Sequence, residues 1–200
     1  IKKGKELGLD VWIYDENSYP SGFAGGNLPD QMPESYNQGQ LLHMMEANVL
    51  PANTEDMVVV LKEENGSFTD ITSRLVAEKD QQGKYYLFRK EYYKKGAHMV
   101  GAADFPYVDL MVRGVTEKFI EITMKGYEKI AAKDFGKTVP GVFSDEPEIM
   151  VQGTGNIRWT PDLFSAFRQK WGYDLETHLP SLFEETGDWK KIRHNYQQTL

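Results

Sequence analysis

The segment that decides the predicted fold is residues 9–16, LDVWIYDE, in which a run of β-branched and aromatic residues ends in two adjacent carboxylates. A run of this length and composition predicts a β-strand. Residues 139–146, VPGVFSDE, repeat the design and again end in an Asp-Glu pair. Each predicted strand therefore presents one pair at its C-terminal end, Asp15 and Glu16 in the first and Asp145 and Glu146 in the second.

Helical patterns surround these two strands. Residues 116–135 carry apolar side chains at three- and four-residue spacings, which predicts an amphipathic helix. A further helix is predicted over residues 34–47 and another after Thr160-Pro161-Asp162, while residues 107–111 read as a third short strand. The alternation predicts an α/β fold with parallel strands, which we interpret as part of a (β/α)8 TIM barrel.

The middle of the chain has the pattern of antiparallel strands and not that of alternating strands and helices. Asn65-Gly66 lies between two β-rich runs, which is a strong hairpin signal, and residues 85–88 form a third run. We therefore predict a small antiparallel β module inserted in the barrel and three segments: barrel residues 1–48, the insert at 49–96, and barrel residues 97–200. Because only three parallel strands can be counted, the chain is expected to be an internal fragment of a larger protein.

Composition excludes several classes of function. The chain has 23 Lys and Arg against 30 Asp and Glu, a net charge of −7, and it has no basic run, so no nucleic-acid partner is predicted. No apolar run approaches the roughly 18 residues that a membrane span requires. The absence of cysteine excludes disulfides, thiolate metal sites and a cysteine nucleophile.

The two Asp-Glu pairs are the sharpest candidates for chemistry. Active sites of α/β barrels lie at the C-terminal ends of the strands. Side-chain alternation places Glu16 opposite the aliphatic face of its strand and Glu146 on the face with the smaller residues, so both glutamates are expected to point into the barrel. Two converging glutamates fit acid–base attack on a glycosidic bond. The competing interpretation is that both pairs are ordinary solvated carboxylates at strand ends.

Three motifs resemble those of a known family. Residues 11–26 contain VWIYDE followed by YPSG and AGG, residues 141–147 read GVFSDEP, and residues 171–175 read WGYDL. In this order they resemble glycoside hydrolase family 106. The resemblance implies an α-L-rhamnosidase-like hydrolase that removes terminal α-L-rhamnosides from plant-type polysaccharides or glycosides with inversion. It also implies a (β/α)8 catalytic core and a catalytic pair at Glu16 and Glu146.

The roles that follow are expectations. Glu16 is assigned as general acid and Glu146 as general base. The resemblance implies that Ca²⁺ contributes to sugar binding, although the chemistry requires no cofactor and no ligand can be named. It further implies a secreted or periplasmic protein, a carbohydrate substrate, and a site completed by the rest of the parent chain, so this fragment alone is expected to be inactive. The expected substrate-binding residues are Asp15, Tyr19, Ser21, Gly22, Asp145, Glu148 and Trp159.

Two alternatives remain open at the level of sequence. Carboxylates at strand ends serve many substrates, so another TIM-barrel glycosidase, such as one resembling a β-galactosidase, fits the same pattern. A non-catalytic carbohydrate-binding protein would retain the cleft without turnover.

Overall fold

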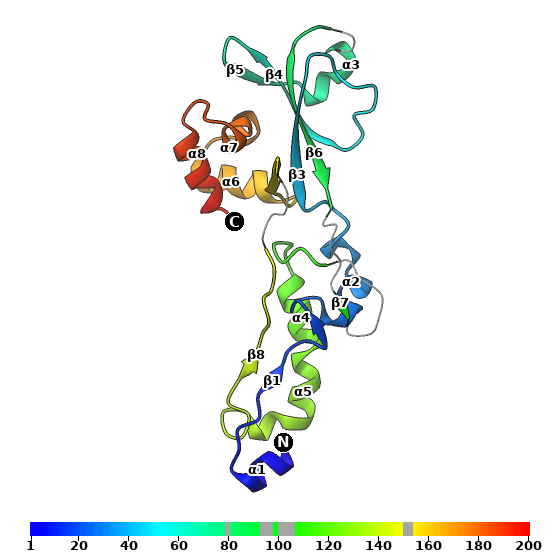
Figure 1. Ribbon diagram of the computed structural model, residues 1–200, viewed down its shortest axis with the longest axis vertical. Helices are drawn as coiled ribbons and strands as arrows, with labels where there is room; N and C mark the ends of the chain where they lie inside the picture. The colour runs from blue at the N-terminus through cyan, green and yellow to red at the C-terminus, as the bar shows by residue number, and fades with distance from the viewer. Residues whose placement is uncertain (79–80, 93–97, 100–106, 150–153) are drawn as a thin grey trace. The chain divides into compact units, whose positions relative to one another are not determined.

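The computed structural model describes residues 1–78, 81–92, 98–99, 107–149 and 154–200 (Figure 1). The chain divides into two compact units. Unit 1 comprises Ile1–Asn37 and Tyr93–Ile149, and unit 2 comprises Gln38–Tyr92 and Met150–Leu200. The sequence pattern predicted boundaries after residues 48 and 96, so the observed boundaries differ from the predicted ones. Each unit has its own hydrophobic core.

Unit 1 is built from short elements. In chain order they are α1 (Lys2–Leu7), β1 (Ile13–Tyr14), β2 (Ser18–Tyr19), η1 (Ala24–Gly26), α2 (Asn27–Gln31), η2 (Pro33–Ser35), β7 (His98–Met99), α4 (Val115–Ile122), α5 (Met124–Ala131), η4 (Ala132–Asp134) and β8 (Val142–Phe143). β1 pairs with β8 in parallel, and β2 pairs with β7 in antiparallel orientation. The core forms where Phe23 and Leu28 pack with Tyr107, Val108 and Val115. This packing joins the segment from Phe23 to α2 with residues 107–115, at the start of α4.

The helix predicted over residues 116–135 forms in two pieces, α4 and α5, which meet at Thr123. The hydroxyl of Thr123 donates a hydrogen bond to the carbonyl of Phe119 at 2.7 Å. Bonding of this kind by a threonine side chain competes with the helical backbone and bends helices. The amphipathic pattern therefore predicted the helix and not its break.

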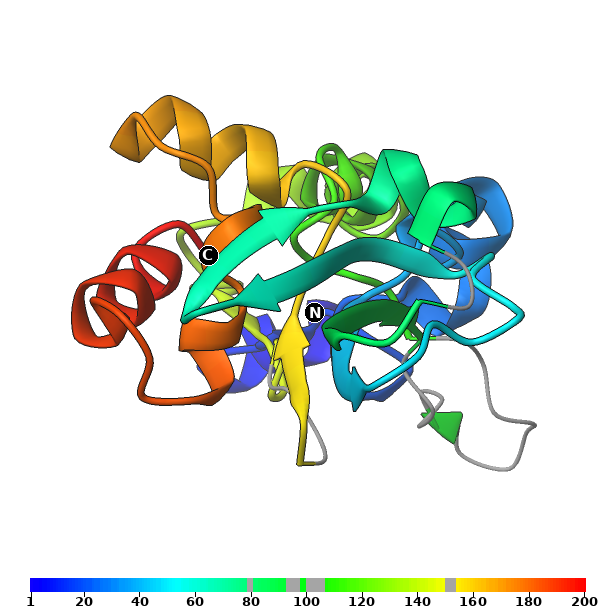
Figure 2. The same ribbon diagram turned by 90° about the horizontal axis from the view of Figure 1, so that it is seen from above.

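Unit 2 contains the larger sheet and the C-terminal helices. Its elements are β3 (Leu41–Ala47), β4 (Met57–Glu64), β5 (Ser67–Asp70), η3 (Thr72–Arg74), α3 (Leu75–Glu78), β6 (Lys84–Glu91), β9 (Asn156–Arg158), α6 (Leu163–Trp171), η5 (Glu176–His178), α7 (Pro180–Phe183) and α8 (Trp189–Gln197). The strand order is β5-β4-β6-β3-β9, and every pairing is antiparallel. Figures 1 and 2 show the twisted strands with the C-terminal helices beside them.

Both faces of this sheet are covered. On one face, Leu61 and Phe88 pack with Phe167 of α6 and Ile192 of α8. On the other, Leu87 and Val60 pack with Ile71, and the half-buried Leu75 of α3 packs against the same cluster. Because side chains alternate along a strand, a sheet covered on two faces needs apolar residues at consecutive positions. Consecutive buried residues occur at Val59, Val60 and Leu61 and at Tyr85, Tyr86, Leu87 and Phe88.

The predicted (β/α)8 barrel is wrong. Among the named strands of the described residues, parallel pairing is confined to β1 and β8, and the largest sheet is antiparallel. A barrel of that class requires parallel strands that each lead into a helix. The β module is also not a self-contained insert, because its strands β4, β5 and β6 share one sheet with β3 and β9 from outside residues 49–96. The observed architecture is a mixed α/β protein.

Two local predictions fail for related reasons. The second half of residues 34–47, predicted as a helix, forms β3, which pairs with β6 on one side and β9 on the other. The spacing of the apolar residues there also suits a strand buried on both faces, and the partners supply the hydrogen bonds that decide between the two. Residues 107–111, predicted as a strand, form a loop and turn, and Tyr107 and Val108 are buried in the core of unit 1.

Candidate functional site at the ends of β1 and β8

The parallel pairing of β1 with β8 brings the two Asp-Glu segments together. Ile13 is paired with Val142, and Tyr14 with Phe143. The amide of Asp15 donates to the carbonyl of Phe143 at 3.1 Å, which extends the pairing past the end of β1. Both carboxylate pairs therefore leave the sheet at the same end, as the sequence pattern predicted for parallel strands.

Ser21 links the two strand ends. Its hydroxyl donates to Asp15 Oδ1 at 2.6 Å and accepts from the amide of Asp145 at 2.8 Å. Its own amide donates to the carbonyl of Asp145 at 2.8 Å. Ser21 and Asp15 are both buried, so these bonds are shielded from water. A buried serine is therefore the centre of the site, and its role is to hold the two carboxylate segments in register.

A buried tyrosine adds a second link that the sequence analysis missed. The hydroxyl of Tyr107 donates to the carbonyl of Ser21 at 2.7 Å and accepts from the amide of Glu148 at 2.9 Å. Gly22 lies beside the hydroxyl end of Tyr107, since a Cβ at its position would come within 3.1 Å of the hydroxyl oxygen. Tyr107 is distant from both motifs in sequence and has no local signal of its role.

The bridge predicts a measurable contribution to stability. Replacing Ser21 with Ala removes the hydrogen bond to a buried carboxylate and leaves the Asp145 amide without its acceptor. We expect the free energy of unfolding to fall by about 1–3 kcal/mol, as measured by urea denaturation. The matched control is Ser144→Ala, because that hydroxyl is exposed and bonds to none of the described residues; it should change stability by less than about 0.5 kcal/mol. Equal effects of the two substitutions would contradict the bridging role.

Glu16 is buried although its strand neighbours Trp12 and Tyr14 are exposed. β1 ends at Tyr14, so the alternation that predicted the direction of Glu16 no longer applies two residues later. Its Oε1 accepts from the amide of Asn17 at 3.0 Å, while Oε2 is buried without a hydrogen-bond partner among the described residues. Burial raises the pKa of Glu16, and the nearby backbone amides of Asn17, Ala24, Gly25 and Gly22 oppose the increase.

The raised pKa predicts the pH dependence of stability. A carboxyl group whose pKa is higher in the folded state binds its proton more tightly there, so its contribution is fully present below the ordinary value of 4.5 and is lost as the pH rises through the folded pKa. We expect the wild-type free energy of unfolding, relative to that of Glu16→Gln, to fall as the pH rises from the ordinary value of 4.5 toward neutrality. Denaturation of both proteins across this range measures the difference. A difference that grows with pH would show that the backbone amides outweigh burial.

Glu146, unlike Glu16, lies at the surface. Its side chain is exposed, and its backbone has φ 45°, in the left-handed region. A non-glycine residue in such a conformation costs on the order of 1–3 kcal/mol, and conformations of this kind are concentrated at functional sites. Tyr19 donates its hydroxyl hydrogen to Glu146 Oε2. This bond, together with the negative charges nearby, raises the pKa of Tyr19 to about 12.

Two tyrosines thus contact the second carboxylate pair. Tyr19 holds Glu146, and the hydroxyl of Tyr14 lies 3.1 Å from both Asp145 Oδ2 and the carbonyl of Ser18. Tyr14 also stacks on Phe143, with ring centroids 5.7 Å apart. Although the side chain as a whole is exposed, partial desolvation of the hydroxyl and its hydrogen bond to the Asp145 carboxylate raise the pKa of Tyr14. The carboxylates of Asp145 and Glu146 are therefore each oriented by a neutral phenol.

The remaining predicted residues have different surroundings. The amide of Glu148 is bound by Tyr107, and its side chain is half-buried. Trp159 belongs to unit 2, where it is buried in the core and tilted against Phe164 at a centroid distance of 6.4 Å. With 6% of its surface exposed, its ring offers almost no face for stacking on a sugar.

The calcium ion implied by the sequence resemblance remains a prediction. No group of three or more His, Asp or Glu side chains in the described part of the chain is arranged to hold a metal ion. Calcium requires about six to eight oxygen ligands. At the ends of β1 and β8, Ser21 and the two tyrosines instead bond to Asp15, Asp145 and Glu146. No calcium-dependent step is derived for this site.

The fold and site define a mixed α/β protein with a paired-carboxylate centre at the end of a two-stranded parallel sheet. No protein-family model, curated protein or solved structure matches the chain. Among the helices of the described residues, none has the length and apolar character needed to cross a bilayer.

Proposed function

We propose that this protein is a glycoside hydrolase that cleaves terminal α-L-rhamnosides with inversion. The observation that carries the proposal is the Ser21 bridge, which joins the Asp15-Glu16 and Asp145-Glu146 segments at one end of the parallel sheet. Glycoside hydrolysis requires two carboxyl groups in different protonation states. The rhamnoside specificity rests on the resemblance of the sequence motifs. That resemblance also implies that the rest of a parent chain contributes to the substrate site.

The two glutamates have environments that suit different roles. Burial raises the pKa of Glu16, which favours the neutral, proton-donating form of a general acid. Glu146 is exposed, and its Oε2 accepts from Tyr19, which leaves Oε1 without a partner among the described residues. A carboxylate held in this way can accept a proton from an attacking water. Glu16 is therefore the proposed acid and Glu146 the proposed base.

The burial of Glu16 sets a condition on this mechanism. Its unpartnered Oε2 is covered, while the backbone amides of Gly22, Ala24 and Gly25 lie close enough to affect its pKa. Protonation of a leaving group requires direct contact with that group or contact through one water. The loop over residues 22–26 must therefore open before Glu16 can act as an acid. If the loop stays closed, the same site suits a carbohydrate-binding protein without turnover, which is the second candidate function.

The direct test is release of p-nitrophenol from aryl α-L-rhamnoside, β-D-galactoside and β-D-glucoside by the protein expressed from its complete reading frame. We expect turnover of the rhamnoside, with β-L-rhamnose as the first product seen by NMR because inversion changes the anomeric configuration. Turnover of only the galactoside would replace the proposal with the β-galactosidase-like alternative. Binding of L-rhamnose without turnover of any substrate would support the carbohydrate-binding alternative.

A further inference from the structure

Unit 2 contains a cavity of about 570 Å³ that lies apart from the carboxylate residues in sequence and that the proposed hydrolysis does not use. It is bounded by the hairpin turn between β4 and β5 on one side and by η5, α7 and the start of α8 on the other. This volume falls in the range of small-molecule sites. The residues that line it include Phe68, Tyr173, Thr177, His178, Asp188 and Lys191.

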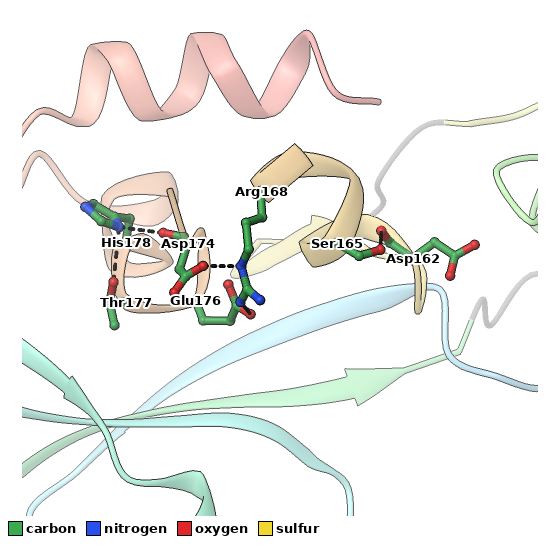
Figure 3. Close-up of polar contacts among 7 residues, drawn as sticks. All are labelled: Asp162, Ser165, Arg168, Asp174, Glu176, Thr177 and His178. Atoms are coloured by element: carbon green, nitrogen blue, oxygen red, sulfur yellow. Dashed lines mark hydrogen bonds and ion pairs between the residues drawn. The ribbon is translucent and has the colours of Figure 1, made fainter. Parts of the chain in front are cut away.

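Polar contacts hold the segment that carries Thr177 and His178 in place (Figure 3). Arg168 of α6 forms an ion pair with the carboxylate of Asp174 and a second with Glu176 Oε1 at 3.2 Å. His178 Nδ1 lies 2.8 Å from the carbonyl of Asp174 and 3.2 Å from Thr177 Oγ1. A carbonyl can only accept a hydrogen bond, so Nδ1 carries the proton in this bond. In the neutral ring, Nε2 is therefore an acceptor.

The aromatic wall is also held in place. The ring of Tyr173 stands nearly perpendicular to Phe167, at 5.0 Å and 89°, and lies at 71° to the His178 ring, at a centroid distance of 5.4 Å. Asn195, which is buried, donates to the Tyr173 hydroxyl at 2.8 Å. Phe68 extends the apolar wall from the hairpin turn. A rigid aromatic surface lowers the entropy lost when a ligand binds.

Two groups of opposite charge complete the lining. Asp188 precedes α8 but does not cap it with its side chain, and within the described residues its carboxylate has no hydrogen bond or ion pair. Lys191 lies one turn further along α8. Its ammonium nitrogen is 5.5 Å from the centroid of the Tyr173 ring and makes no other contact with the described residues. The cavity therefore offers a charged acceptor, a charged donor, a neutral acceptor at His178 and an aromatic face.

This combination selects among ligand classes. Asp188 disfavours an anion and Lys191 disfavours a cation, because a like charge nearby costs binding free energy. A purely apolar ligand would separate both charged groups from water without replacing their hydrogen bonds. A neutral polyhydroxylated ring satisfies all of them: its hydroxyls donate to Asp188 and His178 and accept from Lys191, while its C–H face contacts the aromatic wall. We propose that this cavity binds one neutral monosaccharide unit.

The proposal is independent of the hydrolase proposal, since it uses no residue of the β1–β8 site. The test is ligand-observed NMR titration of the intact protein with L-rhamnose, D-galactose and D-glucose as separate probes. We expect at least one sugar to bind. Lys191→Ala and Asp188→Asn should each weaken the affinity for that sugar by about tenfold, because each removes a charge-assisted hydrogen bond. Both side chains are exposed, so melting temperatures should change little.

The matched control is Lys190→Ala, which removes a neighbouring ammonium group that lies over the Trp189 ring instead of lining the cavity. This variant should bind the sugar as the wild type does. Unchanged affinity in both cavity variants, or the absence of binding by every sugar probe, would overturn the proposal. Inorganic phosphate is the negative probe, and its binding with loss in Lys191→Ala would identify an anion site instead. The absence of aryl-glycoside turnover, by contrast, would count only against the hydrolase.

Discussion

Replacing Glu16 or Glu146 with Gln is expected to lower the turnover of aryl α-L-rhamnoside by about 10²–10⁴-fold, the usual contribution of a positioned acid or base. Glutamine preserves the volume of the side chain and cannot transfer the proton. Steady-state kinetics should show the loss mainly in kcat, because the missing step is chemical and binding of the substrate survives.

The two variants should differ from each other. A substrate whose leaving group needs no protonation should partly restore the rate of Glu16→Gln, since that variant lacks only the proton donor. Glu146→Gln should remain slow with the same substrate, because activation of water is still missing. A crystal structure with bound substrate should place the two carboxyl groups about 6.5–9.5 Å apart, the separation that accommodates a water in inverting enzymes.

The control for this pair is Glu34→Gln, which changes an exposed glutamate in η2 of the same unit. It should leave the kinetics unchanged. Near-normal turnover in both Glu16→Gln and Glu146→Gln would remove the catalytic assignment. A rate loss in Glu16→Gln that an activated leaving group does not restore would instead identify Glu16 as a residue that organises the loop over residues 22–26.

Replacing Phe167 with Ala is expected to lower the free energy of unfolding of unit 2 by about 3–5 kcal/mol, the range for truncation of a buried aromatic ring. Phe167 has no exposed surface and joins α6 to the sheet in the main core of this unit. It also supports Tyr173, which forms part of the aromatic wall of the cavity. Guanidinium denaturation followed by circular dichroism measures the loss.

The comparison variant is Phe164→Ala, the same change on the same helix at a half-buried position. Less surface is removed from the core there, so the loss should be clearly smaller. If the two substitutions cost the same, the packing of α6 against the sheet would be less specific than the structure indicates.

Predictions that depended on neighbouring residues are confirmed. The helix predicted after Thr160-Pro161-Asp162 is α6, and it ends at Gly172, whose φ of 77° is readily adopted by a residue without a Cβ. Asn65 and Gly66, with φ of 54° and 79°, form the predicted hairpin turn between β4 and β5. In each case the deciding interactions lie within a few residues, so the local pattern contains them.

Two predictions failed because the partners of a strand lie far from it in the sequence. Leu41 and Leu42 belong to β3 because β6 and β9, from residues 84–91 and 156–158, supply its hydrogen bonds along both edges. Both side chains are buried. Periodicity alone does not separate a short buried helix from a strand buried on both faces. The barrel prediction failed with this strand, because a barrel needs further parallel partners and the chain forms an antiparallel sheet instead.

By itself, the sequence determined that two strand-like segments end in carboxylate pairs and that Tyr19 and Ser21 lie near the first, since these features are written in consecutive residues. Only the tertiary structure decided that Ser21 bridges the pairs, that Tyr107 secures the bridge and that Glu16 is buried while Glu146 is exposed. The cavity in unit 2, which Lys191 and the hairpin turn both line, was likewise not predicted from the sequence. The physical reason is that burial and hydrogen bonding depend on which distant segments pack together, and that choice minimises the free energy of the whole chain and not of any one segment.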